Sequence, residues 1–485
     1  MHFTSLTYLA FLPLVLLAYR LTDSRRLQNI LLLTASYVFY GWWDYRFCFL
    51  MLASSLIDFA IGTLLQRQSD AHTRKALLAV SIGCNLGLLG IFKYLNFFIE
   101  SFREAGQQLG FNMNGGTLEI ILPVGISFYT FQTMSYTLDI YRRQLKAADS
   151  LIDYLAFVSF FPQLVAGPIE RAGNLLPQLQ KRREISSADV ASGLRQIFCG
   201  FFKKIVIADS IAGFVTAAYT DPVQTAGPEL VLATVLFAFQ IYCDFSAYSD
   251  IAIGTAKLFG ITLMQNFAYP YFSQSIHEFW QRWHISLSTW FRDYVYIPLG
   301  GNRGSDFLRN RNVMLTFIVS GFWHGAAWNF LGWGALHGTA LLAENTAAPT
   351  ARKKKQPVNR LLPSTSRLLR MLLTFVIVCL GWVLFRADSL ADAVLIWQKM
   401  FASVAQTAQW NAIWTQYISG GPLYYSINLL IVFVLVEWVH RHMAFPLEIG
   451  HWPTPIRWPA YTLVLWLIIE HADKTPQSPF VYFQF

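Results

Sequence analysis

The stretch LIDYLAFVSFFPQLVAGPI, residues 151–169, is the most informative about the fold. It is apolar, and yet it differs from a simple membrane-spanning helix. Its flanks are basic on both sides, from Arg142 to Lys146 and from Arg171 to Arg183, and basic flanks favour the cytoplasmic side. Pro162 and Pro168 interrupt a straight helix. We therefore expect a re-entrant element. Because irregular backbone at membrane depth must be buried in protein or line a water-filled cavity, the fold should contain an internal funnel.

The composition of the whole chain places it in a membrane. Of its 485 residues, 54% are apolar, 16% are aromatic and only 13% are charged, and the mean hydropathy is +0.39. Soluble domains carry about 25% charged residues, whereas a spanning helix needs about 20 apolar residues. These values exclude a disordered chain, a collagen, a secreted disulfide scaffold and a soluble enzyme. They predict an all-α polytopic membrane protein.

The alternation of apolar segments and basic loops predicts a single transmembrane domain over residues 1–485, with about ten spanning helices and both termini extracytoplasmic. Further re-entrant elements are expected at 276–300, which is too polar for lipid contact, and at 312–345, where a hairpin is the alternative. An outer loop over 388–421 should hold an amphipathic helix at Leu390 to Met400. The spans are expected near residues 3–19, 28–43, 47–65, 77–99, 118–141, 190–218, 229–258, 367–386, 422–440 and 457–471.

Charge and cysteine content argue against nucleic acid and metal as ligands. The net charge of +9 lies in short clusters between apolar segments, not in a basic stripe interleaved with aromatic residues. The five cysteines fall inside apolar segments without a CxxC pair and are typical of small buried side chains. No HExxH motif or carboxylate cluster accompanies the histidines, so no metal site is expected.

His324 is the most informative polar residue, because it lies in the apolar stretch SGFWHGAAW at 320–328. Polar groups at membrane depth are costly and usually functional. A desolvated imidazole stays neutral and is able to accept a proton, as a general base must. The alternative is a core histidine that donates a hydrogen bond to a backbone carbonyl.

His284 is a second candidate, in the stretch RWHIS at 282–286. Its functional interpretation is a supporting or gating role, and the alternative is a structural hydrogen bond. Seven residues separate it from His277, which predicts that the two share one helical face.

Two carboxylates, Asp244 and Asp250, lie in a sequence otherwise typical of a membrane helix. Their spacing is wrong for an acid–base pair on a helix. We expect them to pair with buried arginines, such as Arg282 or Arg292, and to fix the packing.

The C-terminal residues PFVYFQF at 479–485 are unusual, because chain ends are ordinarily polar and solvated. Four aromatic side chains in so short a segment predict burial, in a cavity on the outer face. The phenol of Tyr482 would there either anchor the tail through a hydrogen bond or accept an acyl group.

Several stretches together resemble the membrane-bound O-acyltransferase superfamily, and within it the bacterial branch of the alginate O-acetylation membrane protein and the D-alanyl-lipoteichoic acid export protein. They are spread over most of the chain in the family's order. The stretches are LPVGISFYTFQ at 122–132, FPQLVAGPI at 161–169, residues 242–254, RWHISLSTWFRD at 282–293, SGFWHG at 320–325, GWVLFRA at 381–387 and FVYFQF at 480–485.

The resemblance implies a ring of helices around a funnel and acyl transfer across the bacterial cytoplasmic membrane. The superfamily's near-invariant histidine matches His324, and its second, more variable histidine matches His284. An acetyl thioester, expected to be acetyl-CoA, would enter from the cytoplasm, and His324 would deprotonate the accepting hydroxyl. Arg303 and Arg311 are expected near the cytoplasmic mouth, where they would hold the donor's phosphates.

By the same analogy, Tyr482 would take the acetyl group and pass it outward. An extracytoplasmic, esterase-like transferase would then acetylate an exported polysaccharide, with membrane lipid as the other expected contact. A carrier-protein-bound acyl or D-alanyl donor, a lipid- or protein-modifying acyltransferase, a transporter or flippase for a lipid-linked sugar, and a non-catalytic scaffold stay open as alternatives. The sequence does not separate alginate, cellulose, another exopolysaccharide and peptidoglycan as the final acceptor.

Overall fold

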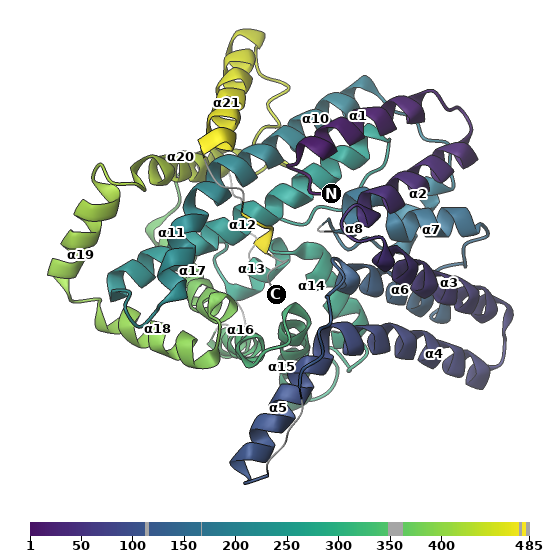
Figure 1. Cartoon of the computed structure of the whole chain (residues 1–485), viewed down its shortest axis with the longest axis horizontal. Helices are drawn as coiled ribbons and strands as arrows, with labels where there is room; N and C mark the ends of the chain where they lie inside the picture. Colours follow the sequence, from purple (N-terminus) through teal and green to yellow (C-terminus); the bar gives the residue numbers. More distant parts are fainter. Residues whose placement is uncertain (112–115, 166, 348–361, 475–477, 482–485) are drawn as a thin grey trace. The chain divides into compact units, whose positions relative to one another are not determined.

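The structure is a computed structural model that describes residues 1–111, 116–165, 167–347, 362–474 and 478–481. Throughout this part of the chain the regular elements are helices, and no strand occurs (Figure 1). The predicted all-α class is therefore confirmed. The contacts group the chain into two compact units: unit 1 comprises residues 1–197 and 251–264, and unit 2 comprises residues 198–250 and 265–485. That the chain forms one domain stays a prediction.

The helices that begin in unit 1 are mostly those expected from the apolar pattern, shifted by a few residues. They are α1 (Leu6–Arg20), α2 (Arg25–Gly41), α3 (Arg46–Arg67), α4 (Ala71–Leu89), η1 (Gly90–Tyr94), α5 (Leu95–Gln108), α6 (Ile126–Tyr141), α7 (Leu151–Ser159), α8 (Phe161–Leu164), α9 (Ala172–Leu179) and α10 (Ser187–Phe201).

Unit 2 begins within α10, and its further helices follow the same pattern. They are η2 (Phe202–Ala208), α11 (Asp209–Thr220), α12 (Gly227–Leu258), η3 (Pro270–Phe272), α13 (Ile276–Arg282), α14 (Ile285–Phe291), η4 (Arg292–Tyr296), α15 (Asp306–His324), α16 (Trp328–Ala347), α17 (Thr365–Arg386), α18 (Leu390–Ala402), α19 (Thr407–Ile413), η6 (Trp414–Ile418), α20 (Tyr424–His440) and α21 (Thr454–Lys474). Residues 251–258 of α12 are grouped with unit 1.

The segment at 151–169 is broken, as its prolines predict. Helix α7 ends at Ser159, Phe160 leaves the helical region with ψ of 106°, and Pro162 opens the four-residue helix α8. Proline suits the first turn of a helix, where its missing N–H has no intrahelical partner anyway. The interruption is thus confirmed, whereas a re-entrant path through the membrane stays a prediction.

Polar side chains tie α3, α4 and α6 together inside unit 1. Asp58 accepts hydrogen bonds from the Ser81 hydroxyl at 2.6 Å and from the Asn85 amide at 2.7 Å. The Thr133 hydroxyl donates to Asn85 Oδ1 at 3.0 Å. Burying such groups is costly unless each finds a partner, so this network fixes the register of the three helices.

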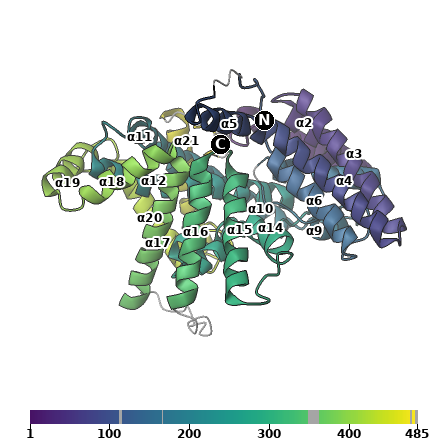
Figure 2. The same ribbon diagram turned by 90° about the horizontal axis from the view of Figure 1, so that it is seen from below.

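In unit 2, α15 and α16 form the hairpin that was one of the two predictions for 312–345, and α16 packs in turn on α17 (Figure 2). Helix α18 occupies the stretch predicted to be an amphipathic helix. In the most apolar part of α12, 78% of the residues are buried within the protein. Helix α12 is therefore a core helix with little surface left for lipid.

Four helical segments of the described chain are long and apolar enough to cross a membrane: α3, the run from α4 to α5, α12 and α17. Helices α1 and α20 are shorter and apolar. The apolar helices agree with the polytopic class. The count of ten spans and the funnel stay predictions.

Candidate active site

Glycines bring the two helices of the α15–α16 hairpin into backbone contact. A Cβ atom on Gly321 would lie 2.2 Å from the Phe330 carbonyl oxygen, and one on Gly334 would lie 2.3 Å from the Phe317 carbonyl oxygen. Any larger residue would force the helices apart. The stretch SGFWHG is therefore required for the close packing of this hairpin, in which α15 ends at His324.

His324 lies in an aromatic surrounding. Its side chain is buried, and three rings flank it: Trp323 at 5.0 Å, Trp333 at 4.9 Å and Phe385 at 5.3 Å between ring centroids. Each of the three rings lies edge to face with the imidazole of His324. These rings shield the imidazole from bulk water, which is the desolvated position that the sequence predicted.

His284 occupies a sharp turn between α13 and α14. Its backbone is left-handed, with φ of 42° and ψ of 55°, a conformation that non-glycine residues adopt at a cost and that often marks functional sites. The side chain is fully buried. Burial lowers the pKa of His284 to about 3, because a buried imidazolium would lose its hydration. The ring is therefore neutral at physiological pH.

Asn266 determines which nitrogen of His284 carries the proton. Its Oδ1 accepts from the Ser286 backbone N–H at 3.2 Å and from the Ser286 hydroxyl at 2.9 Å, and it lies 3.1 Å from His284 Nδ1. A backbone N–H can only donate, so the Asn266 atom is the carbonyl oxygen. Nδ1 of His284 must then donate as well, and Nε2 is the nitrogen that bears the lone pair.

The turn at His284 is itself held by Asn266. The Ile285 N–H donates to the Asn266 backbone oxygen at 2.9 Å, and the Asn266 side-chain amide lies 3.2 Å from the Ser249 hydroxyl. Sequence reasoning missed Asn266. The signal available was a pair of adjacent amide side chains, Gln265 and Asn266, between the apolar residues ITLM at 261–264 and the aromatic stretch FAYPYF at 267–272.

Trp323 brings the two predicted histidines together. Its ring lies 6.3 Å from the His284 ring and 5.0 Å from the His324 ring, between centroids. The two imidazoles thus approach the same indole from different elements of unit 2. Two buried imidazoles near one another, one of them with its tautomer fixed, form an arrangement of the kind that can transfer protons.

The prediction for His277 is wrong. The helix stops at Arg282 and resumes at Ile285, so His277 and His284 do not share a helical face. His277 instead lies in α13, where its Nε2 is 2.9 Å from the Gln281 side-chain nitrogen one turn further along the helix.

The predicted partners of Asp244 and Asp250 are also wrong. Lys204 pairs with Asp244 at 2.8 Å, and Lys203 pairs with Asp250 at 3.0 Å. Arg282 pairs within its own helix with Glu278, and Arg292 pairs with the adjacent Asp293. Lysines from η2 rather than arginines offset the buried carboxylates.

Arg303 and Arg311 lie on the exposed surface of unit 2. Arg303 lies within a glycine-rich turn in which Gly300, Gly301 and Gly304 all have positive φ, and Arg311 lies in α15, which follows this turn. The Arg311 guanidinium donates to Asn312 Oδ1 at 2.9 Å, and Asn312 in turn donates to the Gly301 carbonyl at 3.1 Å. Asn312 thus links the helix that carries Arg311 to the turn that carries Arg303.

The C-terminal aromatic segment is described only up to Val481, so Tyr482 lies outside the described residues. Phe480 and Val481 are buried, as the sequence predicted for this segment. The Phe480 ring lies 5.6 Å from the Phe245 ring, and Phe245 meets His284 edge to face at 4.6 Å. One ring therefore separates the described tail from His284.

Cysteines and metal-ligating side chains form no further site in the part of the chain that the structure describes. Its five cysteines are free thiols. No group of three or more His, Cys, Asp and Glu side chains there has the geometry to hold a metal ion.

Comparison with known proteins shows the family of the chain. Residues 141–355, which include His284 and His324, match the family model of the membrane-bound O-acyltransferases. The chain is 42% identical to the probable alginate O-acetylase AlgI of Azotobacter vinelandii over 83% of this chain and 78% of that protein. It is 34% identical to the peptidoglycan O-acetyltransferase of Helicobacter pylori over 82% and 79%.

A more distant similarity extends to the teichoic acid D-alanyltransferase of Bacillus subtilis, at 30% identity over 54% of this chain and 68% of that protein. The names of these three relatives describe O-acetylation of alginate, O-acetyl transfer to peptidoglycan and D-alanyl transfer to teichoic acid. With its helical fold, its apolar helices and its buried histidine pair, the chain belongs to the membrane-bound O-acyltransferase family and is an O-acyltransferase.

Proposed function

We propose that this enzyme takes an acetyl group from acetyl-CoA on the cytoplasmic side of the bacterial inner membrane and passes it outward for O-acetylation of an exported polysaccharide. The observation that carries the proposal is the pair of buried imidazoles, His324 and His284, which both lie close to Trp323. The names of two relatives, an alginate O-acetylase and a peptidoglycan O-acetyltransferase, support acetyl as the group transferred.

In this mechanism the first acceptor is the phenol of Tyr482. As the phenol oxygen attacks the thioester carbonyl, His324 takes the phenol proton. The new C–O bond forms, the C–S bond breaks, and the thiolate that leaves recovers the proton from the imidazolium. An extracytoplasmic esterase-like partner would then move the acetyl group from the tyrosine oxygen to a polysaccharide hydroxyl and regenerate the phenol.

His284 and the two arginines have supporting roles in the proposal. The Nε2 lone pair of His284 accepts a hydrogen bond from a group in the site, because Asn266 holds the proton on Nδ1. Arg303, in the exposed glycine-rich turn, and Arg311, on the exposed part of α15, bind the donor's phosphates, since guanidinium groups suit phosphate recognition. Both chain termini are extracytoplasmic in this arrangement.

Labelling tests the proposal directly. The purified protein is incubated in detergent with radiolabelled acetyl-CoA, and retained label is mapped by peptide sequencing. We expect label on Tyr482 that is absent from Tyr482→Phe and from His324→Ala. Turnover of acetyl-CoA by the wild type without retained label would keep the acetyltransferase and refute the tyrosine relay.

The same assay separates the alternative donors and classes. If the enzyme turns over only with an acyl-carrier protein or a D-alanyl-carrier protein, the donor is that carrier-bound group and not acetyl-CoA. Movement of a lipid-linked sugar that is unchanged in His324→Ala would favour a transporter over the proposed function.

Replacing Asn266 by alanine should lower the rate of acetyl transfer by about 10- to 100-fold, because His284 loses the group that fixes its tautomer. The change should fall on kcat, with KM for acetyl-CoA little altered, since Asn266 does not touch the donor in this scheme. Ser249→Ala is the matched control, because it removes the contact on the other side of the same amide. Equal effects of the two substitutions would show that Asn266 matters for packing alone.

A further inference from the structure

A buried charged cluster in unit 2 contacts the C-terminal segment. It consists of Lys204, Asp209 and Asp244, and the ammonium lies 2.9 Å from Asp209 and 2.8 Å from Asp244. All three side chains are buried. The mechanism above uses none of them.

The cluster is electrostatically incomplete without the tail. Two carboxylates face one ammonium, which leaves an excess negative charge in a buried place. An isolated buried charge is very costly unless donors satisfy it. The tail supplies those donors: the Ser478 N–H and hydroxyl donate to Asp209, and the Val481 N–H donates to Asp244 at 2.7 Å.

The contact is reciprocal, because Lys204 also needs the tail. Its ammonium donates to the Ser478 carbonyl at 2.9 Å and lies 3.2 Å from the Ser478 hydroxyl. Three donors and two acceptors of Ser478 and Val481 are therefore satisfied by residues of η2, α11 and α12.

An apolar contact completes the seat. The Phe480 ring, between Ser478 and Val481 in sequence, lies 4.2 Å from the Tyr248 ring and 5.6 Å from the Phe245 ring, between centroids. Phe245 in turn contacts His284. The polar contacts thus hold the segment at Ser478 and at Val481, on both sides of Phe480, whose ring packs against Phe245.

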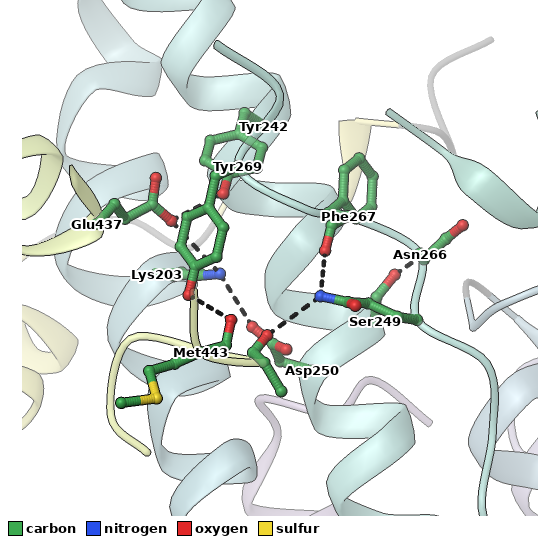
Figure 3. Close-up of polar contacts among 11 residues, drawn as sticks. Lys203, Tyr242, Ser249, Asp250, Asn266, Phe267, Tyr269, Glu437 and Met443 are labelled. Carbon is green, nitrogen blue, oxygen red and sulfur yellow. Dashed lines mark hydrogen bonds and ion pairs between the residues drawn. The ribbon is translucent and has the colours of Figure 1, made fainter. Parts of the chain in front are cut away.

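The π-helical turn η2 carries Lys204 and also a second buried lysine, Lys203, with which Lys204 can be compared. Lys203 and Lys204 are adjacent, and both are buried. Lys203 turns to a different pair of carboxylates, Asp250 at 3.0 Å and Glu437 at 3.9 Å (Figure 3). The Tyr242 hydroxyl supplies a donor to Glu437 at 2.7 Å. Two similar charge clusters therefore lie side by side on η2, and the one at Lys204 binds the tail.

We propose that Lys204, Asp209 and Asp244 form the anchor that holds the C-terminal segment Ser478–Val481, with Phe480 separated from His284 by the Phe245 ring, and that acyl transfer to Tyr482, the next residue in the chain, requires this anchor. The three are positioning residues, not catalytic ones. The part of this inference that concerns transfer rests on the proposed function; the anchoring itself does not.

The test uses the full chain and two readouts. Hydrogen–deuterium exchange of the C-terminal peptide measures anchoring, and label retained from radiolabelled acetyl-CoA measures transfer. In Lys204→Met the C-terminal amides should exchange about tenfold faster or more. Label on Tyr482 should fall by about tenfold or more, while hydrolysis of acetyl-CoA by water continues. Lys203→Met, which removes an equally buried lysine, should leave exchange of the C-terminal peptide unchanged.

A second pair of variants leaves the buried helices intact. Val481→Pro removes the N–H that donates to Asp244 and also fixes φ at this residue, whereas Val481→Ala keeps the N–H and shortens the side chain. Faster exchange in Val481→Pro than in Val481→Ala supports the anchor. Wild-type exchange in both Lys204→Met and Val481→Pro, or equal loosening in Lys203→Met and Lys204→Met, would overturn it.

The two proposals fail in different ways. If exchange follows the expected pattern but Tyr482 is never labelled, the anchor stands and the tyrosine relay falls. If Tyr482 is labelled at the wild-type level in a Lys204→Met protein whose tail exchanges rapidly, the relay stands and the positioning role of the anchor is refuted.

Discussion

Replacing His324 by alanine is expected to lower the rate of acyl transfer by about 10²- to 10⁴-fold, the range that a positioned general base contributes. The imidazole sits among Trp323, Trp333 and Phe385, with its access to water restricted. Few other groups at this place would accept the proton of the attacking hydroxyl. The measurement is the initial rate of CoA-thiol release coupled to acyl transfer, in detergent-purified protein.

Two controls separate chemistry from packing in that experiment. His324→Gln keeps a polar side chain of similar volume but no basic nitrogen, and it should be as inactive as the alanine variant. His277→Ala removes a histidine that lies on α13 against Gln281, and it should keep the wild-type rate. Wild-type transfer by His324→Gln would mean that His324 is a structural residue.

Replacing Gly321 by alanine should impair both stability and activity. Its Cβ would lie 2.2 Å from the Phe330 carbonyl oxygen and 3.2 Å from the Gly334 nitrogen, and backbone atoms of a packed hairpin cannot move aside easily. Overpacking of this kind costs about 1–3 kcal/mol. Because α15 must shift and His324 ends it, transfer should fall by up to about 10²-fold.

Thermal unfolding in detergent and the initial transfer rate measure the two effects of Gly321→Ala. Gly213→Ala in α11 is the matched control, because a Cβ there meets nothing within 4 Å. It should leave both stability and rate unchanged, apart from the small gain in helix propensity that alanine brings. Equal behaviour of the two variants would show that α15 and α16 do not need the close approach.

Much of the helical framework follows from the sequence alone. Nearly every apolar segment that was expected to span corresponds to a helix, and the break at Pro162 and the α15–α16 hairpin were also expected. The physical reason is that backbone polar groups in an apolar environment must be satisfied within the helix, so long apolar runs have a single solution. The burial of His324 was expected for a related reason, because the residue lies inside an apolar run. Its role as a base stays a prediction, which rests on the cost of burying a polar group at membrane depth.

The tertiary structure decided which polar groups meet. Asn266 lies 18 residues from His284, and Val481 lies 237 residues from Asp244. No periodicity connects such positions, and the sequence accordingly suggested arginines as partners of Asp244 and Asp250 where the fold supplies Lys204 and Lys203. Hydropathy reports how much apolar surface each segment buries, whereas hydrogen bonds and ion pairs depend on distances of a few ångströms that only packing sets. The class, the helices and the burial of His324 could therefore be predicted from the sequence, because they depend on how much apolar surface each segment carries. Packing alone set the tautomer of His284 and the contacts of the C-terminal segment.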